Sequence, residues 1–170
     1  MRLRDYLVGQ PVRLTSRHSP REVAERINEA AGSRFWPFHT DAVVGGVWLG
    51  RLRLRYVSSP FEYNAKPQLA GGLREGRSGS ILELRYRAPS WVYVFDLVWF
   101  GALGMVTLVM LGLVGERNPD LTNNDLVFIW TILLALLAAP LALHYVGTGN
   151  SDEELGYLLD FLAERIDAKA

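Results

Sequence analysis

The chain has 170 residues, no cysteine, and eighteen basic residues balanced by eighteen acidic ones. The lack of cysteine excludes a disulfide framework and a thiolate metal site. The overall balance hides an asymmetry. Residues 1–90 hold fourteen Arg and one Lys against eight acids, whereas residues 91–170 hold three bases against ten acids. The sequence therefore has a basic front half and an acidic back half.

Residues 1–90 predict one small cytosolic α+β domain. Residues 11–15 suit a short strand. Ser19-Pro20-Arg21-Glu22 is typical of a helix start, because Ser19 can cap free amides and Glu22 can reach back to the Ser19 amide. This local pattern predicts a helix immediately after Ser19.

Strand patterns dominate the rest of this domain. Residues 51–56 and 82–87 both alternate with a period of two, and each segment puts Leu, Leu and Tyr on one face and charges on the other. Residues 68–74 suit a third strand, followed by a turn at 75–79. An antiparallel meander with one buried and one wet face is the simplest architecture.

Three arginines of one predicted strand, Arg51, Arg53 and Arg55, share its wet face. The ordinary interpretation is a solvated face. The alternative is a site for anionic lipid or a small anion, since guanidinium groups bind phosphate well. Nucleic acid is not expected, because Tyr56 and Tyr86 fall on the apolar face and provide no stacking platform.

Two later stretches predict a transmembrane hairpin over residues 91–146. Residues 91–114 contain Asp96 as their one charged group, and residues 126–146 contain His144 as the one group that titrates near neutrality. As helices they would be about 36 and 31 Å long, enough for a hydrocarbon core of about 30 Å. A chain of this size has too little other mass to hide two helices that are apolar on every side.

The charges beside these stretches predict their orientation. Arg85 and Arg87 precede the first span, whereas Arg117 is the single base of the connection 115–125. The positive-inside rule therefore places residues 1–90 in the cytoplasm, and two crossings return the carboxyl end to the same side. Both spans lie too deep in the chain to be cleavable signals. The expected location is the inner or plasma membrane, crossed twice, with both termini cytoplasmic.

The two polar groups of the spans predict an intramembrane pair. In an antiparallel hairpin Asp96 and His144 fall in the same half of the bilayer, within about one helical turn in depth. Ionisable groups in a membrane usually find partners, so a hydrogen bond between them is expected, as a structural clasp rather than a proton relay. Gly101 and Gly104 allow close helix approach, within the hairpin or in a homo-oligomer.

Residues 147–170 predict a cytosolic amphipathic helix. Ser151-Asp152-Glu153-Glu154 resembles a capping box, with acids at the positive end of the helix dipole. An apolar stripe follows and is expected to dock on the first domain, so that the fold closes after the chain returns. The alternative is a partner-binding or dimerisation helix. The stripe consists of Leu155, Leu158, Leu159, Leu162 and Ile166.

Residues 48–100 resemble part of a known group of proteins. The segments Trp48-Leu49-Gly50-Arg51, residues 64–73, and residues 79–87 running into the first span resemble small uncharacterised bacterial integral membrane proteins with two spans and a cytosolic α+β domain. The resemblance implies a location and a layout. It implies no catalytic or binding residue.

Motifs for chemistry are lacking in the sequence. It has no nucleophile elbow, dinucleotide turn or phosphate loop, and His18, His39 and His144 have no metal-ligand spacing. His39 and Asp41 follow Pro37 and are interpreted as turn formers. No cofactor, metal site or enzymatic activity is expected.

Three classes of function follow from these patterns. The first is a membrane-anchored interaction or accessory module, with the bilayer and a protein partner or homo-oligomer as partners. The second is a module that binds anionic lipid or a small anion through Arg51, Arg53 and Arg55. The third is an enzyme or a transport component, and transport would require an oligomer because two spans alone form no pathway.

Overall fold

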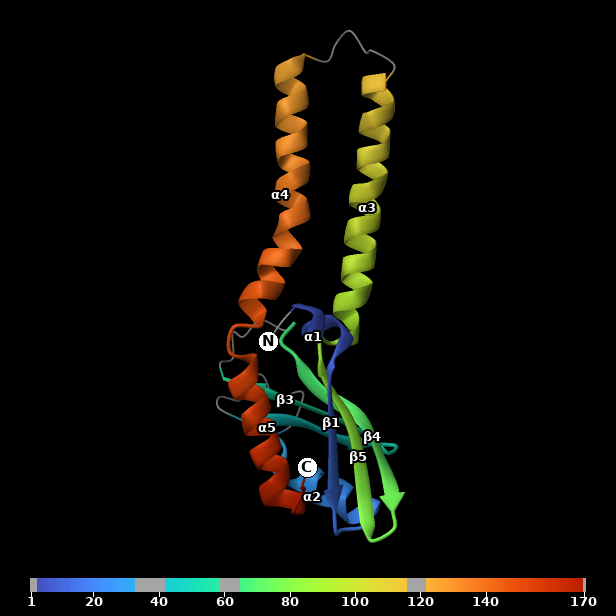
Figure 1. The fold of residues 1–170 in the computed structure, drawn as a ribbon, viewed down its shortest axis with the longest axis vertical. Coiled ribbons are helices and arrows are strands. Elements are labelled where there is room, and N and C mark those ends of the chain that lie inside the picture. The colour runs from blue at the N-terminus through green and yellow to red at the C-terminus, as the bar shows by residue number, and fades with distance from the viewer. Residues whose placement is uncertain (1–2, 33–41, 59–64, 116–121, 170) are drawn as a thin grey trace. The chain divides into compact units, whose positions relative to one another are not determined.

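The computed structural model describes residues 3–32, 42–58, 65–115 and 122–169 (Figure 1). The chain divides into two compact units, one formed by Met1–Pro89 with Gly147–Ala170, and the other by Ser90–Val146. The predicted fold class is confirmed. It is α+β, with one antiparallel sheet, two long apolar helices and a carboxyl-terminal amphipathic helix.

The first unit is built on a five-stranded antiparallel sheet with the strand order β1-β5-β4-β3-β2. The strands β3, β4 and β5 form the expected meander. The strand β2, which was not predicted, extends it by pairing with β3, and β1 extends the other end by pairing with β5. The elements of this unit are α1 (Leu3–Val8), β1 (Gln10–Ser16), α2 (Pro20–Ala30), β2 (Ala42–Trp48), β3 (Arg51–Val57), β4 (Gln68–Gly76), β5 (Gly79–Arg87) and α5 (Ser151–Ile166).

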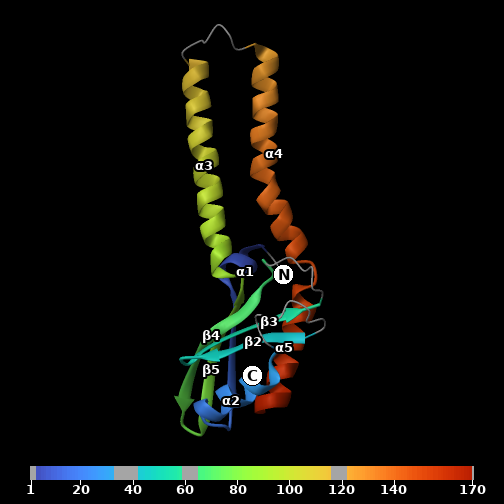
Figure 2. The ribbon, with the colours of Figure 1, turned by 180° about the vertical axis from the view of Figure 1, so that it is seen from behind.

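One face of the sheet is covered by α2 and α5, as both views of the ribbon show (Figures 1 and 2). The alternation of β3 and β5 directs Leu52, Leu54, Leu82 and Leu84 into this layer, where they are buried. The helices contribute their own apolar stripes, and burial of such surface is the main driving force for closing the unit. The buried helical residues of this core are Val23, Ile27, Leu155, Leu158, Leu162 and Ile166.

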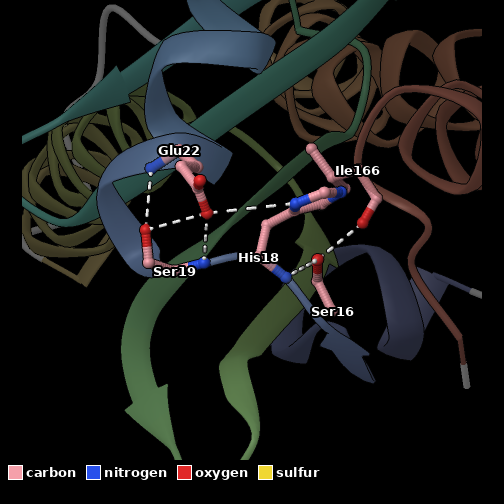
Figure 3. Close-up of polar contacts among 5 residues, drawn as sticks. All are labelled: Ser16, His18, Ser19, Glu22 and Ile166. Atoms are coloured by element: carbon pink, nitrogen blue, oxygen red, sulfur yellow. Dashed lines mark hydrogen bonds and ion pairs between the residues drawn. The ribbon is translucent and has the colours of Figure 1, made fainter.

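Hydrogen bonds join the end of the chain to β1. The Ser16 hydroxyl donates to the Ile166 carbonyl at 2.5 Å, and it accepts from the His18 amide at 3.2 Å (Figure 3). Thr15 and Lys169 exchange backbone hydrogen bonds of 2.8 and 2.9 Å. The first strand and the last residues are therefore parts of one folded unit, although the long apolar segment separates them in sequence.

The helix start at Ser19 has the expected geometry. The Ser19 hydroxyl accepts from the Glu22 amide, and the Glu22 carboxylate accepts from the Ser19 amide at 2.9 Å (Figure 3). The Ser19 amide and the Ser19 hydroxyl both donate to the Glu22 carboxylate, and these two donors lower the pKa of Glu22 below its ordinary value because they stabilise the charged form. The capping box is therefore confirmed at this helix.

The capping box expected at Ser151 is wrong. The residue at the amino-terminal cap of α5 is Asn150, and it makes no capping hydrogen bond through its side chain. Ser151 lies inside the helix and donates to the Thr148 carbonyl at 2.7 Å, while Glu154 pairs with Lys66. The Glu154 carboxylate, which the local sequence pattern assigned to the helix cap, instead pairs with Lys66, a residue distant in sequence.

The second unit consists of α3 (Ser90–Gly115) and α4 (Asn123–Gly147), which run side by side in both views (Figures 1 and 2). Each contains a 23-residue segment long and apolar enough to cross a membrane, Ser90–Gly112 and Asn123–Tyr145. In their most apolar parts, 0 % and 6 % of the residues are buried. These helices are therefore not core helices hidden by the rest of the chain.

Candidate functional site

The uncovered face of the sheet carries a group of arginines. Arg51 and Arg53 on β3 are exposed, and Arg55 on the same side is half-buried. Strand register brings further arginines from other strands to this face, since residues opposite one another on neighbouring strands point the same way. We call the exposed set the arginine face: Arg13, Arg51, Arg53, Arg74 and Arg85, with Glu83 among them.

Two rows across the sheet show how the charges are spaced. Arg51 is opposite Gly72, which is opposite Glu83, which is opposite Arg13. In the next row Ala70 lies between Arg53 and Arg85. The middle strand thus places small residues between guanidinium groups, and a Cβ atom added at Gly72 would meet no atom within 4 Å. The centre of the arginine face is therefore open, and arginines lie on both sides of it.

Few contacts within the unit neutralise these cations. Glu83 lies 3.4 Å from Arg74, and Arg85 donates to the Val8 carbonyl at 3.3 Å. Among the described residues, Arg13, Arg51 and Arg53 form no ion pair. Exposed guanidinium groups at this density favour an anionic ligand, because planar N–H donors match phosphate and carboxylate oxygens.

The opposite side of the unit is acidic. Helix α5 packs on the covered face of the sheet and turns Asp152, Glu153, Asp160 and Glu164 to solvent, with Arg165 as its one exposed base. The first unit therefore has a basic sheet face and an acidic helix face. Such a charge distribution orients a molecule in the field of an anionic surface.

A buried polar cluster joins the segment before β4 to β5 and α5. The Lys66 ammonium group contacts the Glu154 carboxylate, and both side chains are largely buried. Burial raises the pKa of the nearby Tyr86 phenol, and the negative charges of Glu154 and Asp152 raise it further. Tyr86 therefore stays protonated at neutral pH, and we interpret the cluster as structural. The pairing of Lys66 with Glu154 has no local sequence signal, because 88 residues separate them.

The structure brings Asp96 and His144 together in the second unit. The Nε2 atom of His144 lies 3.1 Å from both carboxylate oxygens of Asp96. A second bridge begins three residues further along α3, where the Trp99 indole donates to the Leu136 carbonyl at 3.0 Å. Both contacts join α3 to α4 through long polar side chains, in a segment whose other side chains are almost all apolar.

The glycines of α3 play no part in joining the two helices. A Cβ atom at Gly101 or Gly104 would meet no described atom within 4 Å. Of the two uses that the sequence allows, close approach within the hairpin is therefore not the one observed. The polar bridges make the contact instead.

The remaining histidines form no metal site in the described residues. The His18 Nδ1 atom lies 3.9 Å from Glu22 (Figure 3), and no group of three or more potential ligands occurs in residues 3–32, 42–58, 65–115 and 122–169. His39 and Asp41 lie outside the described residues.

Comparisons with protein-family models, with curated proteins and with solved structures give no match.

Proposed function

We propose that the chain is an integral membrane protein of the interaction or accessory class, in which α3 and α4 cross the bilayer and the first unit serves as a cytoplasmic module. The observation that carries the proposal is the exposure of two apolar 23-residue helices. As helices of about 1.5 Å rise per residue, each covers about 35 Å, which exceeds the hydrocarbon core. Only a lipid environment removes that much apolar surface from water.

The same solvent argument supports the polar bridges. In lipid, unpaired polar groups are costly, so polar residues on neighbouring spans pair with each other. Asp96, His144 and Trp99 are polar groups on α3 and α4 that have partners on the opposite helix. We interpret the Asp96–His144 contact as a clasp that holds the hairpin together.

The charge distribution supports a cytoplasmic position for both chain ends. Arg85 and Arg87 precede α3 within five residues, and the arginine face belongs to the same unit. Positively charged residues close to a span favour the cytoplasmic side. Because α5 and the last residues fold with β1, the carboxyl end lies on the same side as the sheet.

The surface of the first unit favours an interaction module over a transport component. The arginine face spans four strands and is open at its centre, which suits a binding surface. A layout of this kind also agrees with the proposed resemblance to small bacterial two-span membrane proteins.

Extraction of membranes tests the proposal. Membranes from expressing cells are washed with sodium carbonate at high pH, and the pellet is then treated with a mild detergent. The proposal expects the chain to stay in the carbonate pellet and to dissolve in detergent. Release by carbonate alone, without detergent, would contradict it.

A further inference from the structure

The turn between β2 and β3 presents two large apolar side chains to solvent. Trp48 is 79 % exposed and Leu49 is 81 % exposed. The pair Trp48–Arg51 closes a two-residue turn in which Leu49 and Gly50 both have positive φ, 49° and 71°. Such turns usually hold Asn or Gly, because a left-handed backbone disfavours bulky side chains. The left-handed backbone at Leu49 therefore costs conformational free energy, and the turn nevertheless exposes this leucine beside Trp48.

This turn is continuous with the arginine face. Arg51 follows Gly50 directly and is paired with Trp48 across the hairpin, and Arg53 comes next on the same side of β3. One edge of the unit therefore combines an aromatic ring and a leucine with several guanidinium groups. At a bilayer surface, tryptophan prefers the headgroup level and arginine binds the phosphates.

Charge selects the lipid surface among the ligands that fit this combination. The acidic helix face of α5 lies on the other side of the sheet, so an anionic surface attracts the arginine face and repels the opposite side. The cytoplasmic leaflet is such a surface, and it attracts basic groups that lie within about a Debye length.

Covalent attachment brings the surface close. Two residues, Ala88 and Pro89, separate Arg87 at the end of β5 from the first residue of α3. A short connection of this kind gives the basic unit a high effective concentration at the headgroups. A weak affinity per residue is then sufficient for occupancy.

We propose that the arginine face and the Trp48–Leu49 turn bind the anionic headgroup layer of the membrane. Trp48 and Leu49 enter the interface, and Arg13, Arg51, Arg53 and Arg85 bind lipid phosphates. The proposal rests on the proposed membrane anchoring. It adds a lipid-binding site on the first unit.

A fluorescent label at the turn tests the proposal, because the chain has no cysteine of its own. The full-length Leu49→Cys variant is labelled with an environment-sensitive dye and placed in nanodiscs of phosphatidylcholine with 30 % phosphatidylglycerol (about a third of the lipid, chosen to give a strongly anionic surface). Lipids that carry a spin label near the headgroup serve as quenchers. The matched control carries the dye at Glu164→Cys, on the exposed face of α5.

Two outcomes support the proposal together. The dye at position 49 is quenched in anionic nanodiscs and the dye at position 164 is not. In the background Arg51→Gln/Arg53→Gln/Arg85→Gln, partitioning of the turn falls about a hundredfold, since each arginine near the surface contributes about 1 kcal/mol. The charge-matched control Arg17→Gln/Arg26→Gln/Arg77→Gln, which changes exposed residues outside the arginine face, leaves the quenching in place.

Other outcomes overturn the proposal. Equal quenching at both positions, or quenching that is unchanged in pure phosphatidylcholine, excludes specific binding to anionic lipid. A signal at position 49 that rises with the number of chains per nanodisc shows that a second copy covers the turn. Trp48→Ser with the dye kept at position 49 must also weaken quenching, and no change would remove the turn from the site. Since every sample is already embedded through α3 and α4, failure here leaves the anchoring intact, whereas release by carbonate would end both proposals.

Discussion

The Nε2 atom of His144 is 3.1 Å from both oxygens of Asp96, across the gap between two otherwise apolar helices. The contact closes the end of the hairpin where α3 begins and α4 ends. Hydrogen bonds between membrane-spanning helices contribute about 0.6–2 kcal/mol, so on the proposed membrane location removal of this contact should loosen the hairpin at this end.

Substitutions at the pair should therefore show coupling. We expect Asp96→Ala and His144→Ala each to destabilise the hairpin, and the double variant to lose less than the sum, with a coupling free energy of about 0.5–2 kcal/mol. The measurement is unfolding by sodium dodecyl sulfate in mixed micelles, followed by tryptophan fluorescence. Asp96→Asn keeps an acceptor and should lose less than Asp96→Ala. Additive single effects, with no coupling, would contradict the clasp.

The Lys66–Glu154 contact should be essential to the first unit. Lys66→Met leaves the largely buried Glu154 carboxylate without its cation, and we expect a loss of about 3 kcal/mol in the free energy of unfolding. The double variant Lys66→Met/Glu154→Gln should recover part of that loss. Urea unfolding of the full chain in detergent, followed by near-ultraviolet circular dichroism, measures both.

The exposed pair Arg21–Glu25 provides the matched control. Arg21→Met removes a cation of the same charge from an ion pair in solvent, where such pairs contribute little. A loss for Arg21→Met as large as that for Lys66→Met would mean that burial does not determine the effect.

The helix cap at Ser19 predicts a defined acid sensitivity. Ser19→Ala removes the side-chain cap of α2 and should lower the free energy of unfolding by about 1 kcal/mol. Glu22 has a lowered pKa in the folded state, so its contribution is present above its unfolded pKa, near 4.5, and is lost as the pH falls through the lower folded value. In Glu22→Gln this part of the acid dependence should disappear. Identical profiles of stability against pH for the variant and the unchanged chain would refute the assignment.

The raised pKa of Tyr86 predicts that the first unit loses stability as the pH rises into the alkaline range. Its folded pKa is raised above the ordinary value of 10.0, so the stability it contributes is full below pH 10 and declines as the unfolded chain ionises above it. Tyr86→Phe lacks this loss. We expect the variant to gain stability relative to the unchanged chain between pH 9 and 11 (about one pH unit either side of the ordinary tyrosine pKa). Thermal unfolding at a series of pH values measures the difference, and a constant offset would speak against it.

Docking of α5 should carry much of the stability of the first unit. Leu162 is fully buried against the sheet and α2, so Leu162→Ala should cost about 2–5 kcal/mol. Leu159 is only partly buried at the edge of the same cluster, and Leu159→Ala should cost clearly less. A chain that ends at Asn150 should lose cooperative unfolding of the sheet. A truncated chain as stable as the full one would show that α5 is not part of this fold.

Periodicity predicted the parts of the fold in which local pattern and tertiary packing agree. The alternation around Leu52 and Leu84 marked β3 and β5 correctly, and the 3.6-residue spacing of Leu155 to Ile166 marked α5. The pairing of Asp96 with His144 also followed from sequence, because antiparallel geometry fixes the relative depth of residues on two spans.

Elements without a period escaped prediction. The strand β2 contains Gly45 and Gly46, both with positive φ, so its apolar residues do not alternate cleanly. A Cβ atom at Gly45 would lie 2.0 Å from the Arg53 carbonyl, so this strand requires glycine for its close approach to β3. The helix α1 has six residues, too few for a periodic pattern.

The arginine face was predictable only in part, because strand register decides which arginines share it. Arg51, Arg53 and Arg55 are neighbours in sequence, whereas Arg13 and Arg85 join them through strand pairing that no local pattern defines. Ser151 shows the converse error. Its sequence suits a capping box, but Lys66 competes for the Glu154 carboxylate from a distant loop.

Cysteine labelling measures the topology of the hairpin most directly. Asn124→Cys lies at the exposed start of α4, and Glu164→Cys lies on the exposed face of α5. In intact cells we expect a membrane-impermeant maleimide to modify position 124 and to modify position 164 only after the membrane is opened. Labelling of position 164 from outside, or equal labelling of both positions before opening, would contradict a hairpin that crosses the bilayer with its ends in the cytoplasm.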